Sequence, residues 1–267
     1  MNYEKIITGI KSVREFTNKK VDFNLLSMII SDLASIEKLN DTQLDFVIIE
    51  DGKKFAKEFD GKIGYYGKMI PAPSYILVFG ENTEEAKINA GFCLEWVRFA
   101  LWKAQIGSCW ISTMEDVDYP TLFSKKNGET LLACIGVGEE YSGFFRKNTN
   151  QKSERKGVAE FVYTDAWGSE VTWDELQQLG LEEIFYLTKL APSWGNEQPW
   201  KFLIEKNECK LFINRKEGKK FDIEIGIVSL FFVKACESND YRVKASFPPE
   251  ETAERYGDYV CQVIFTL

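Results

Sequence analysis

The sequence predicts a mixed α+β protein built from two degenerate repeats. Helical and strand-like patterns alternate along the 267 residues, and the order found in the first half returns in the second. Ile88–Phe92 aligns with Ile223–Ile227 at an offset of 135 positions, and both segments continue as apolar helices. Asn40 and Phe46 align with Asn196 and Phe202 at an offset of 156. Matches that keep their order in both halves are typical of a tandem duplication, which divides the chain into repeats at 1–157 and 158–267.

The first repeat opens with an amphipathic helix, because apolar residues recur over 22–36 at spacings that form one stripe. Strands are expected at 44–50 and at 73–80, with a loop at 61–67 between them, and the second strand is apolar enough to be central. Residues 89–105 are apolar on nearly every face, which is typical of a core or interface helix.

A buried strand at 129–138 closes the first repeat, and a polar connector at 144–155 follows it. The second repeat is then predicted to contain a helix, a strand, an apolar helix and a last strand, at 174–189, 200–205, 222–235 and 259–265.

Composition excludes several classes of protein. With 41 acidic and 33 basic residues the net charge is −8, which argues against a broad nucleic-acid or anionic-membrane surface. No apolar run reaches the ~20 residues that span a bilayer, and the first residues lack a signal-peptide pattern. We therefore expect a cytoplasmic protein that binds small molecules.

Histidine is absent, and the six cysteines are widely spaced with no C-x-x-C pair. Most of these cysteines sit in apolar runs, where buried free thiols are common, so disulfides are not expected. The usual transition-metal ligands are therefore scarce, and no metal site is predicted. The usual general base is missing too, so the chemistry must come from another group.

The opening segment Ile10–Phe16 offers two cations and a hydroxyl, from Lys11, Ser12 and Arg14, a set suited to a phosphate dianion. It resembles the Arg-Arg-Ser-x-Arg-x-Phe segment of the FMN-dependent nitroreductase family, in which these groups hold the FMN phosphate. Ile10 departs from that pattern. The matching place in the second repeat, Trp167–Glu170, has no cation.

The segment Ala191–Trp200 resembles the loop that holds the isoalloxazine ring in the same family. It carries Pro192, Ser193, Asn196 and Gln198, and the first repeat has no equivalent at 36–40. In the family the loop lies early in the chain, and one subunit of a homodimer supplies it to the flavin of the other. Its late position implies that both partners are fused here.

Further segments resemble the family at the same site. Gly107–Ser112 is similar to its Gly-Thr-Cys-Trp-Ile-Gly strand end, which implies that Trp110, Ile111 and Ser112 border the flavin, although Ser112 replaces a glycine. Lys152–Gly157 resembles the basic segment that completes the phosphate site, through Arg155 and Lys156. Lys68 is a candidate for the N1/O2 edge of the flavin.

Each of these segments also has an ordinary structural interpretation. A Lys-Ser-x-Arg run is common before a helix, Pro-Ser-x-Gly-Asn can be a turn, and Arg155-Lys156 can be a solvated linker face. Their occurrence together and in order favours the flavin site.

The resemblance implies an α+β nitroreductase-like fold whose antiparallel or mixed sheets are flanked by helices, with the two repeats forming an intramolecular pseudo-dimer. The apolar helices at 89–105 and 222–235 would build its interface, and one FMN would lie between the halves. A monomer is then expected, with a homodimer as the alternative.

The implied activity is a ping-pong oxidoreductase: NADH or NADPH gives a hydride to FMN, and a nitroaromatic, quinone or similar acceptor removes it at flavin N5. The acceptor pocket would involve the loops at 51–70 and 240–255. The alternatives are a non-catalytic FMN-binding sensor or store, a flavoenzyme of a different reaction such as reductive dehalogenation, and a domain that has lost its flavin.

Overall fold

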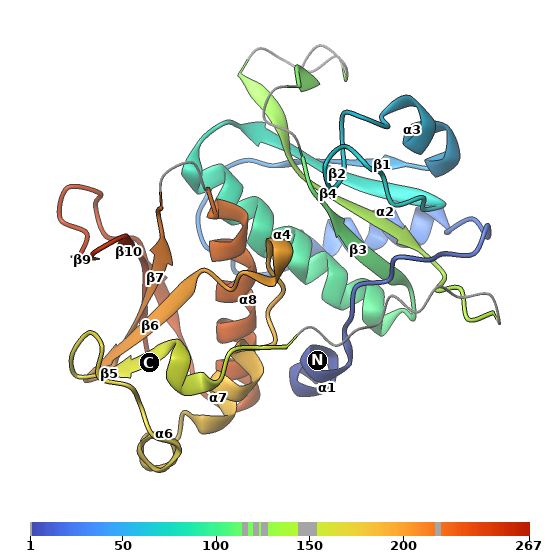
Figure 1. The fold of residues 1–267 in the computed structure, drawn as a ribbon. Helices are drawn as coiled ribbons and strands as arrows, with labels where there is room; N and C mark the ends of the chain where they lie inside the picture. The colour runs from blue at the N-terminus through green and yellow to red at the C-terminus, as the bar shows by residue number, and fades with distance from the viewer. Residues whose placement is uncertain (1, 114–116, 120–122, 124–127, 144–153, 217–219) are drawn as a thin grey trace. The chain divides into compact units, whose positions relative to one another are not determined.

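The computed structural model describes residues 2–113, 117–119, 123, 128–143, 154–216 and 220–267 (Figure 1). The chain forms two compact units. The first-half unit is Gly9–Lys152, and the second-half unit combines Met1–Thr8 with Ser153–Leu267. Arg155 and Lys156 therefore fold with the second-half unit. Most of the connector predicted at 144–155 lies outside the described residues.

The first-half unit contains an antiparallel sheet in the order β1-β2-β4-β3. Its strands are β1 (Asp45–Ile49), β2 (Ser74–Glu81), β3 (Gly107–Ile111) and β4 (Glu129–Gly138). The strands predicted at 44–50, 73–80 and 129–138 are confirmed, and β2 is central as expected.

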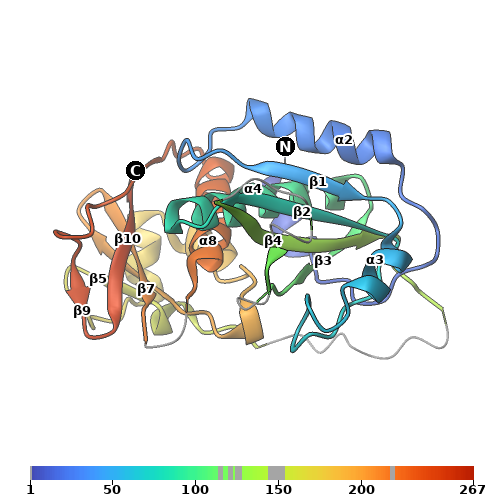
Figure 2. The same ribbon diagram turned by 90° about the horizontal axis from the view of Figure 1, so that it is seen from above.

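Two predicted helices of this unit are also confirmed. The stripe at 22–36 forms α2 (Phe23–Ser31), which continues as the 3-10 helix η1 (Asp32–Ser35). The Asp22 side chain caps α2 by accepting the Asn24 N–H. The apolar helix is α4 (Glu84–Lys103), which packs on β2, β3 and β4 (Figure 2).

One predicted loop contains a helix. We named 51–70 as a loop of the acceptor pocket, and within it Gly52–Glu58 forms the helix α3. The Asp51 side chain accepts the Lys54 N–H and so starts this helix. Phe55 and Phe59 pack on Tyr75 and Phe79 of β2, so burial of aromatic side chains stabilises a helix whose sequence is too short to show a stripe. Residues 61–67 do form turns, as predicted.

The second-half unit contains a sheet in the order β5-β6-β7-β10-β8, with β9 paired to β10. Its strands are β5 (Val162–Thr164), β6 (Trp200–Glu205), β7 (Glu208–Asn214), β8 (Lys244–Ser246), β9 (Arg255–Tyr256) and β10 (Tyr259–Thr266). β5 and β6 are parallel and the other pairs are antiparallel, so this sheet is mixed.

The helices of this unit are α1 (Tyr3–Gly9), whose last residue already belongs to the first-half unit, α6 (Trp173–Leu179), α7 (Glu182–Thr188) and α8 (Asp222–Ser238). Short 3-10 helices occur at η2 (Val158–Glu160) and η3 (Trp194–Asn196). The strands predicted at 200–205 and 259–265 and the helix at 222–235 are confirmed.

The single helix predicted at 174–189 was wrong, because the segment is split into α6 and α7. Gly180 ends α6 with a left-handed backbone (φ 69°), a conformation in which glycine avoids the clash of a side chain. Its N–H bonds to the carbonyls of Leu176 and Gln177. The apolar stripe continues across this break, so periodicity alone could not reveal it.

Phenylalanine rings form the core between the sheet and the helices of the second-half unit. Phe202 of β6 contacts Phe185 of α7 and Phe232 of α8, and Phe232 in turn contacts Phe265 of β10. Among the other aromatic contacts of the unit, Trp167 stacks on Tyr256 with ring centroids 4.6 Å apart. Such packing explains why so many aromatic residues are fully buried.

The two sheets share an order of strands. β6-β7-β10-β8 follows the pattern of β1-β2-β4-β3, and α8 lies between β7 and β8 in sequence as α4 lies between β2 and β3. A duplicated repeat would leave this pattern, and the duplication itself stays a prediction.

Candidate functional site

The segment predicted to bind phosphate lies along the edge of the first sheet. Ser12 forms a parallel bridge with Ser108 at the start of β3, and the Val13 N–H donates to the Ser108 carbonyl at 2.9 Å. Lys11 Nζ is 2.8 Å from Glu140 Oε1, and the Lys11 side chain is half exposed. Arg14 is exposed. The three predicted phosphate ligands are thus presented by one extended stretch.

Ser12 and Arg14 both act on the buried thiol of Cys109. Burial raises the pKa of this thiol, while the charges of Arg14 and Arg98 and a hydrogen bond with the Ser12 side chain lower it. Ser12, Arg14 and Arg98 therefore all influence one buried side chain of β3.

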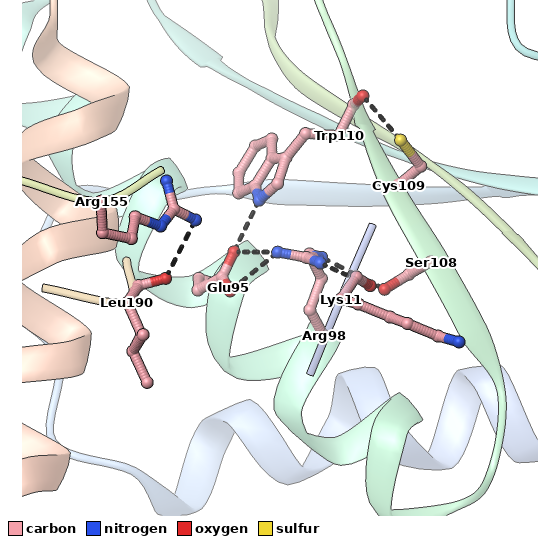
Figure 3. Close-up of polar contacts among 8 residues, drawn as sticks. All are labelled: Lys11, Glu95, Arg98, Ser108, Cys109, Trp110, Arg155 and Leu190. Atoms are coloured by element: carbon pink, nitrogen blue, oxygen red, sulfur yellow. Dashed lines mark hydrogen bonds and ion pairs between the residues drawn. The ribbon is translucent and has the colours of Figure 1, made fainter. Parts of the chain in front are cut away.

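A buried ion pair supports this segment from α4 (Figure 3). Arg98 Nη1 lies 2.8 Å from both carboxylate oxygens of Glu95, and the two residues are 1% and 0% exposed. Arg98 also donates through Nε to Ser108 Oγ at 3.1 Å and through Nη2 to the Lys11 carbonyl at 3.4 Å. It thus links α4, β3 and the backbone of the phosphate segment.

Sequence reasoning missed this pair because the helix at 89–105 was interpreted by its apolar residues alone. Glu95 and Arg98 stand three positions apart in an otherwise apolar helix. Two opposite charges at that spacing can pair on one helix face, and this was the signal available.

The residues predicted to border the flavin at the end of β3 have different surroundings. The Trp110 indole N–H donates to Glu95 Oε2 at 2.6 Å, so this ring belongs to the buried network (Figure 3). Ile111 is buried in the core between the sheet and α3. The Ser112 carbonyl accepts the Gly64 N–H at 2.7 Å.

Lys68 is close in the fold to this strand end. It is exposed and closes the turn Tyr65–Lys68, whose Tyr66 and Gly67 have left-handed backbones. Because Gly64 bonds to Ser112 and Ile63 bridges Thr113, the turn that carries Lys68 is fastened beside the end of β3.

In the second-half unit, Arg155 and Lys156 bind the loop predicted to hold the flavin ring. Arg155 donates to Asn196 Oδ1. It also donates to the Leu190 carbonyl at 3.2 Å (Figure 3). The Lys156 N–H donates to Gln198 Oε1 at 2.9 Å, and its Nζ donates to the carbonyls of Glu197 and Gln198 at 3.1 and 2.8 Å. Two separately predicted segments thus form one hydrogen-bonded cluster.

The loop itself has an unusual backbone. Gly195, Asn196 and Gln198 all have left-handed backbones, with φ values of 56°, 59° and 47°. Ser193 Oγ accepts the Gln198 N–H at 2.9 Å, and Gln198 Nε2 donates to the Asn196 carbonyl at 3.1 Å. Asparagine tolerates this conformation, but glutamine adopts it rarely, so the surroundings of Gln198 must enforce it. Pro192 precedes this run and is partly buried.

Partial burial changes the electrostatics of the cluster. Desolvation lowers the pKa of Arg155. Desolvation and the neighbouring charge of Lys201 lower the pKa of Lys156. Poorly hydrated cations bind carbonyl and anionic oxygens more strongly than exposed ones do, so this pair is suited both to fixing the loop and to binding an anion.

Glu224 of α8 contacts the same loop and was not predicted. Its Oε1 accepts the Trp194 N–H at 3.1 Å. Burial raises its pKa from 4.5 to about 6, and the nearby carboxylates of Asp222 and Glu197 add to the rise. The sequence did show an acidic residue near the start of an apolar helix, but not its contact with a loop thirty positions earlier.

Neither metal chemistry nor a membrane span is visible in the described residues. These residues contain no group of three or more acidic or cysteine side chains that could hold a metal ion. Within the same ranges no helix is long and apolar enough to cross a membrane. All six cysteines are buried free thiols, and burial raises the pKa of Cys93 to about 12.

Comparisons with solved structures find several nitroreductases that are similar to this chain. A putative nitroreductase from Thermotoga maritima is 19% identical with a TM-score of 0.61, over 100% of this chain and 94% of that one. A nitroreductase family protein from Clostridium novyi is 18% identical with a TM-score of 0.46, over 64% and 97%. A Bacteroides fragilis nitroreductase with bound FMN is 17% identical with a TM-score of 0.45, over 57% and 96%.

A comparison with curated proteins finds no match. The family model described as "Putative TM nitroreductase" matches residues 2–236, which include segments of both units. The first of the structural relatives shares the fold over the whole chain. The chain therefore belongs to this nitroreductase family.

Proposed function

We propose that the protein binds one FMN per chain and uses it to pass a hydride from NADH or NADPH to a small-molecule acceptor. The observation that carries the proposal is the cluster in which Arg155 and Lys156 hold Asn196 and Gln198 in a left-handed loop. A loop fixed in this way is preorganised for a ligand, and its resemblance to the ring-holding loop of FMN-dependent nitroreductases supports FMN as that ligand.

The residues of the phosphate segment fit the phosphate of FMN. Arg14 offers an exposed guanidinium, and Ser12 a hydroxyl beside it. Lys11 pairs with Glu140, but both side chains are partly exposed, so the lysine can exchange a carboxylate for a phosphate oxygen at little cost. Arg98 fixes the backbone of the segment through the Lys11 carbonyl.

FMN supplies the hydride-carrying atom, which explains how a chain without histidine could catalyse a redox reaction. The protein's part is to bind, orient and stabilise charge. The exposed cation of Lys68, on a turn fastened to the Ser112 carbonyl, is our candidate for stabilising negative charge at the edge of the flavin. Donor and acceptor would use one pocket in turn, in a ping-pong cycle, with nitroaromatics, quinones and enones as the acceptor classes to test.

The test is an absorption spectrum of the purified protein, with the released chromophore identified and counted per chain, followed by anaerobic addition of NADH or NADPH. We expect close to one FMN per chain and bleaching of its visible absorption. Bleaching without turnover of any acceptor would favour a flavin store or sensor. A colourless protein that takes up no FMN would refute the proposal.

Arg14→Ala is the matching variant, with Arg242→Ala, an exposed arginine of the second-half unit, as its control. Loss of one charge-assisted contact should weaken FMN binding about 10- to 100-fold in the first variant. The control should bind FMN like the unchanged protein. Equal affinities in all three proteins would remove Arg14 from the phosphate site.

A further inference from the structure

Glu224 occupies a position that no part of the predicted flavin motif explains. It is the third residue of α8, and it is 7% exposed. Its carboxylate accepts the backbone N–H of Trp194 at 3.1 Å, whereas the Trp194 side chain is 40% exposed. A buried carboxylate thus fixes the backbone at the start of the left-handed run.

The charges around Glu224 show that the loop contact does not arise from an ion pair. Asp222 on the same helix and Glu197 on the loop are the charged groups that face it, and both are acidic. Among the described residues no lysine or arginine forms an ion pair with Glu224, whereas Asp222 pairs with Arg215. The backbone N–H groups of Trp194 and of Glu224 itself therefore compensate for a costly burial.

The loop is held from two sides by groups of opposite charge. Arg155 and Lys156 donate to its side chains and carbonyls at Asn196, Glu197 and Gln198. Glu224 accepts the N–H of Trp194, the residue before the left-handed run. The left-handed residues lie between these two sets of contacts. Because their backbone conformation is unfavourable by itself, loss of either set should allow the loop to leave it.

We propose that Glu224 is a positioning residue for the ring-binding loop: its carboxylate fixes the Trp194 backbone and, through it, the conformation of the loop up to Gln198. This inference rests on the proposed function for its consequence, because the loop is the part of the second-half unit that would contact the flavin ring. Glu224 itself is not expected to touch the cofactor.

The first test needs no flavin. Hydrogen exchange of the Trp194 amide is measured in the protein free of FMN, in Glu224→Ala, Glu224→Gln and the control Glu251→Ala, an exposed glutamate of the same unit. Protection should fall about tenfold or more in Glu224→Ala, the size expected for losing a hydrogen bond to a charged group. Glu224→Gln keeps an acceptor oxygen without the charge and should be intermediate.

Unchanged protection in Glu224→Ala would overturn the proposal. If that variant does not fold, the isosteric Glu224→Gln decides, and protection equal to that of the unchanged protein overturns it. The control should exchange like the unchanged protein.

The second test measures FMN affinity. We expect Glu224→Ala to bind FMN about tenfold more weakly and Glu224→Gln to recover part of that loss, in the same order as the amide protection. Unchanged FMN affinity in Glu224→Ala would overturn the positioning role. If the protein without any substitution takes up no FMN, the proposed function is refuted instead. The hydrogen-exchange measurement then still decides whether Glu224 holds the loop.

Discussion

Buried charged residues fix the backbone at both candidate segments. In the first-half unit, Arg98 reaches the Lys11 carbonyl and Ser108 while its charge is neutralised by Glu95. In the second-half unit, Glu224 accepts the Trp194 N–H. These groups cost desolvation energy, and a chain selected for stability alone could replace them with apolar residues. Their presence beside the proposed cofactor ligands favours a positioning role.

Arg98→Met tests the first of these groups. The change leaves Glu95 buried and unpaired, so the free energy of unfolding should fall by about 3–5 kcal/mol, measured by urea denaturation. The double variant Glu95→Gln, Arg98→Met removes the stranded charge and should recover part of that loss. A double variant less stable than Arg98→Met would show that the ion pair is not the source of the effect.

The pKa of Glu224 gives a prediction about pH. In the folded protein it is raised from 4.5 to about 6, so the folded state binds this proton more tightly than the unfolded state does. The resulting stabilisation is complete below about pH 4.5 and is lost as the pH rises through about 6. Since one pKa unit corresponds to ~1.4 kcal/mol, the loss is about 2 kcal/mol.

The measurement is the free energy of unfolding of the unchanged protein minus that of Glu224→Gln, taken between pH 4.5 and 7.5. This difference should fall by about 2 kcal/mol across the range, because glutamine does not titrate while the other groups cancel. A difference that does not vary with pH would contradict the raised pKa.

At the scale of elements, the long helices were predictable and many of the short elements were not. The strands β4 and β6 have the predicted ends, and α2, α4 and α8 lie where periodicity placed them. The strands β5, β7 and β8 and the helices α1 and α3 were missed, because segments of three to seven residues depend on the partner they pair with or pack on.

The candidate site divides in the same way. Sequence motifs predict that the segments around Ser12, Arg155 and Asn196 belong to the site, because each carries residue types that its chemistry needs. They could not show that Arg155 reaches Asn196, or that Arg98 reaches Lys11, because each contact joins residues that are tens of positions apart and depends on the tertiary fold. The backbone strain at Gln198 likewise has no signal in the residue type.

Gly180→Ala tests the break between α6 and α7. A side chain at φ 69° is strained, and its Cβ would lie 2.9 Å from the Tyr241 hydroxyl. We expect a loss of about 1–2 kcal/mol in the free energy of unfolding, measured by urea denaturation. Gly257→Ala is the control, because at φ 59° its Cβ meets open space and only the backbone cost applies. A smaller loss at Gly180 than at Gly257 would contradict this account.

At the scale of the whole molecule, the two sheets share one strand order, β1-β2-β4-β3 and β6-β7-β10-β8. This shared order favours the hypothesis that the two halves are copies of one repeat. The proposed phosphate ligands Lys11, Ser12 and Arg14 occur in the first half, and the loop proposed to bind the flavin ring occurs in the second. If the halves descend from one repeat, each has lost what the other keeps, and one chain carries a single complete set of FMN ligands.

This hypothesis predicts a monomer with one FMN per chain. The resemblance to FMN-dependent nitroreductases implies homodimers in which two chains share each flavin. In this chain both sets of proposed ligands are covalently linked, so a second chain would not be needed to complete the site. Sedimentation equilibrium over a wide range of protein concentrations should give a mass near 30.7 kDa, and the FMN content should be close to one per chain at every concentration.

The decisive control is a mixture of two variants, Arg14→Ala and Asn196→Ala, in equal amounts. If one chain provides all ligands, the mixture retains no intact site and binds FMN as weakly as its components. If two chains share each flavin, mixed dimers combine one intact phosphate segment with one intact loop, and recovery of FMN binding in the mixture would contradict the single-chain site.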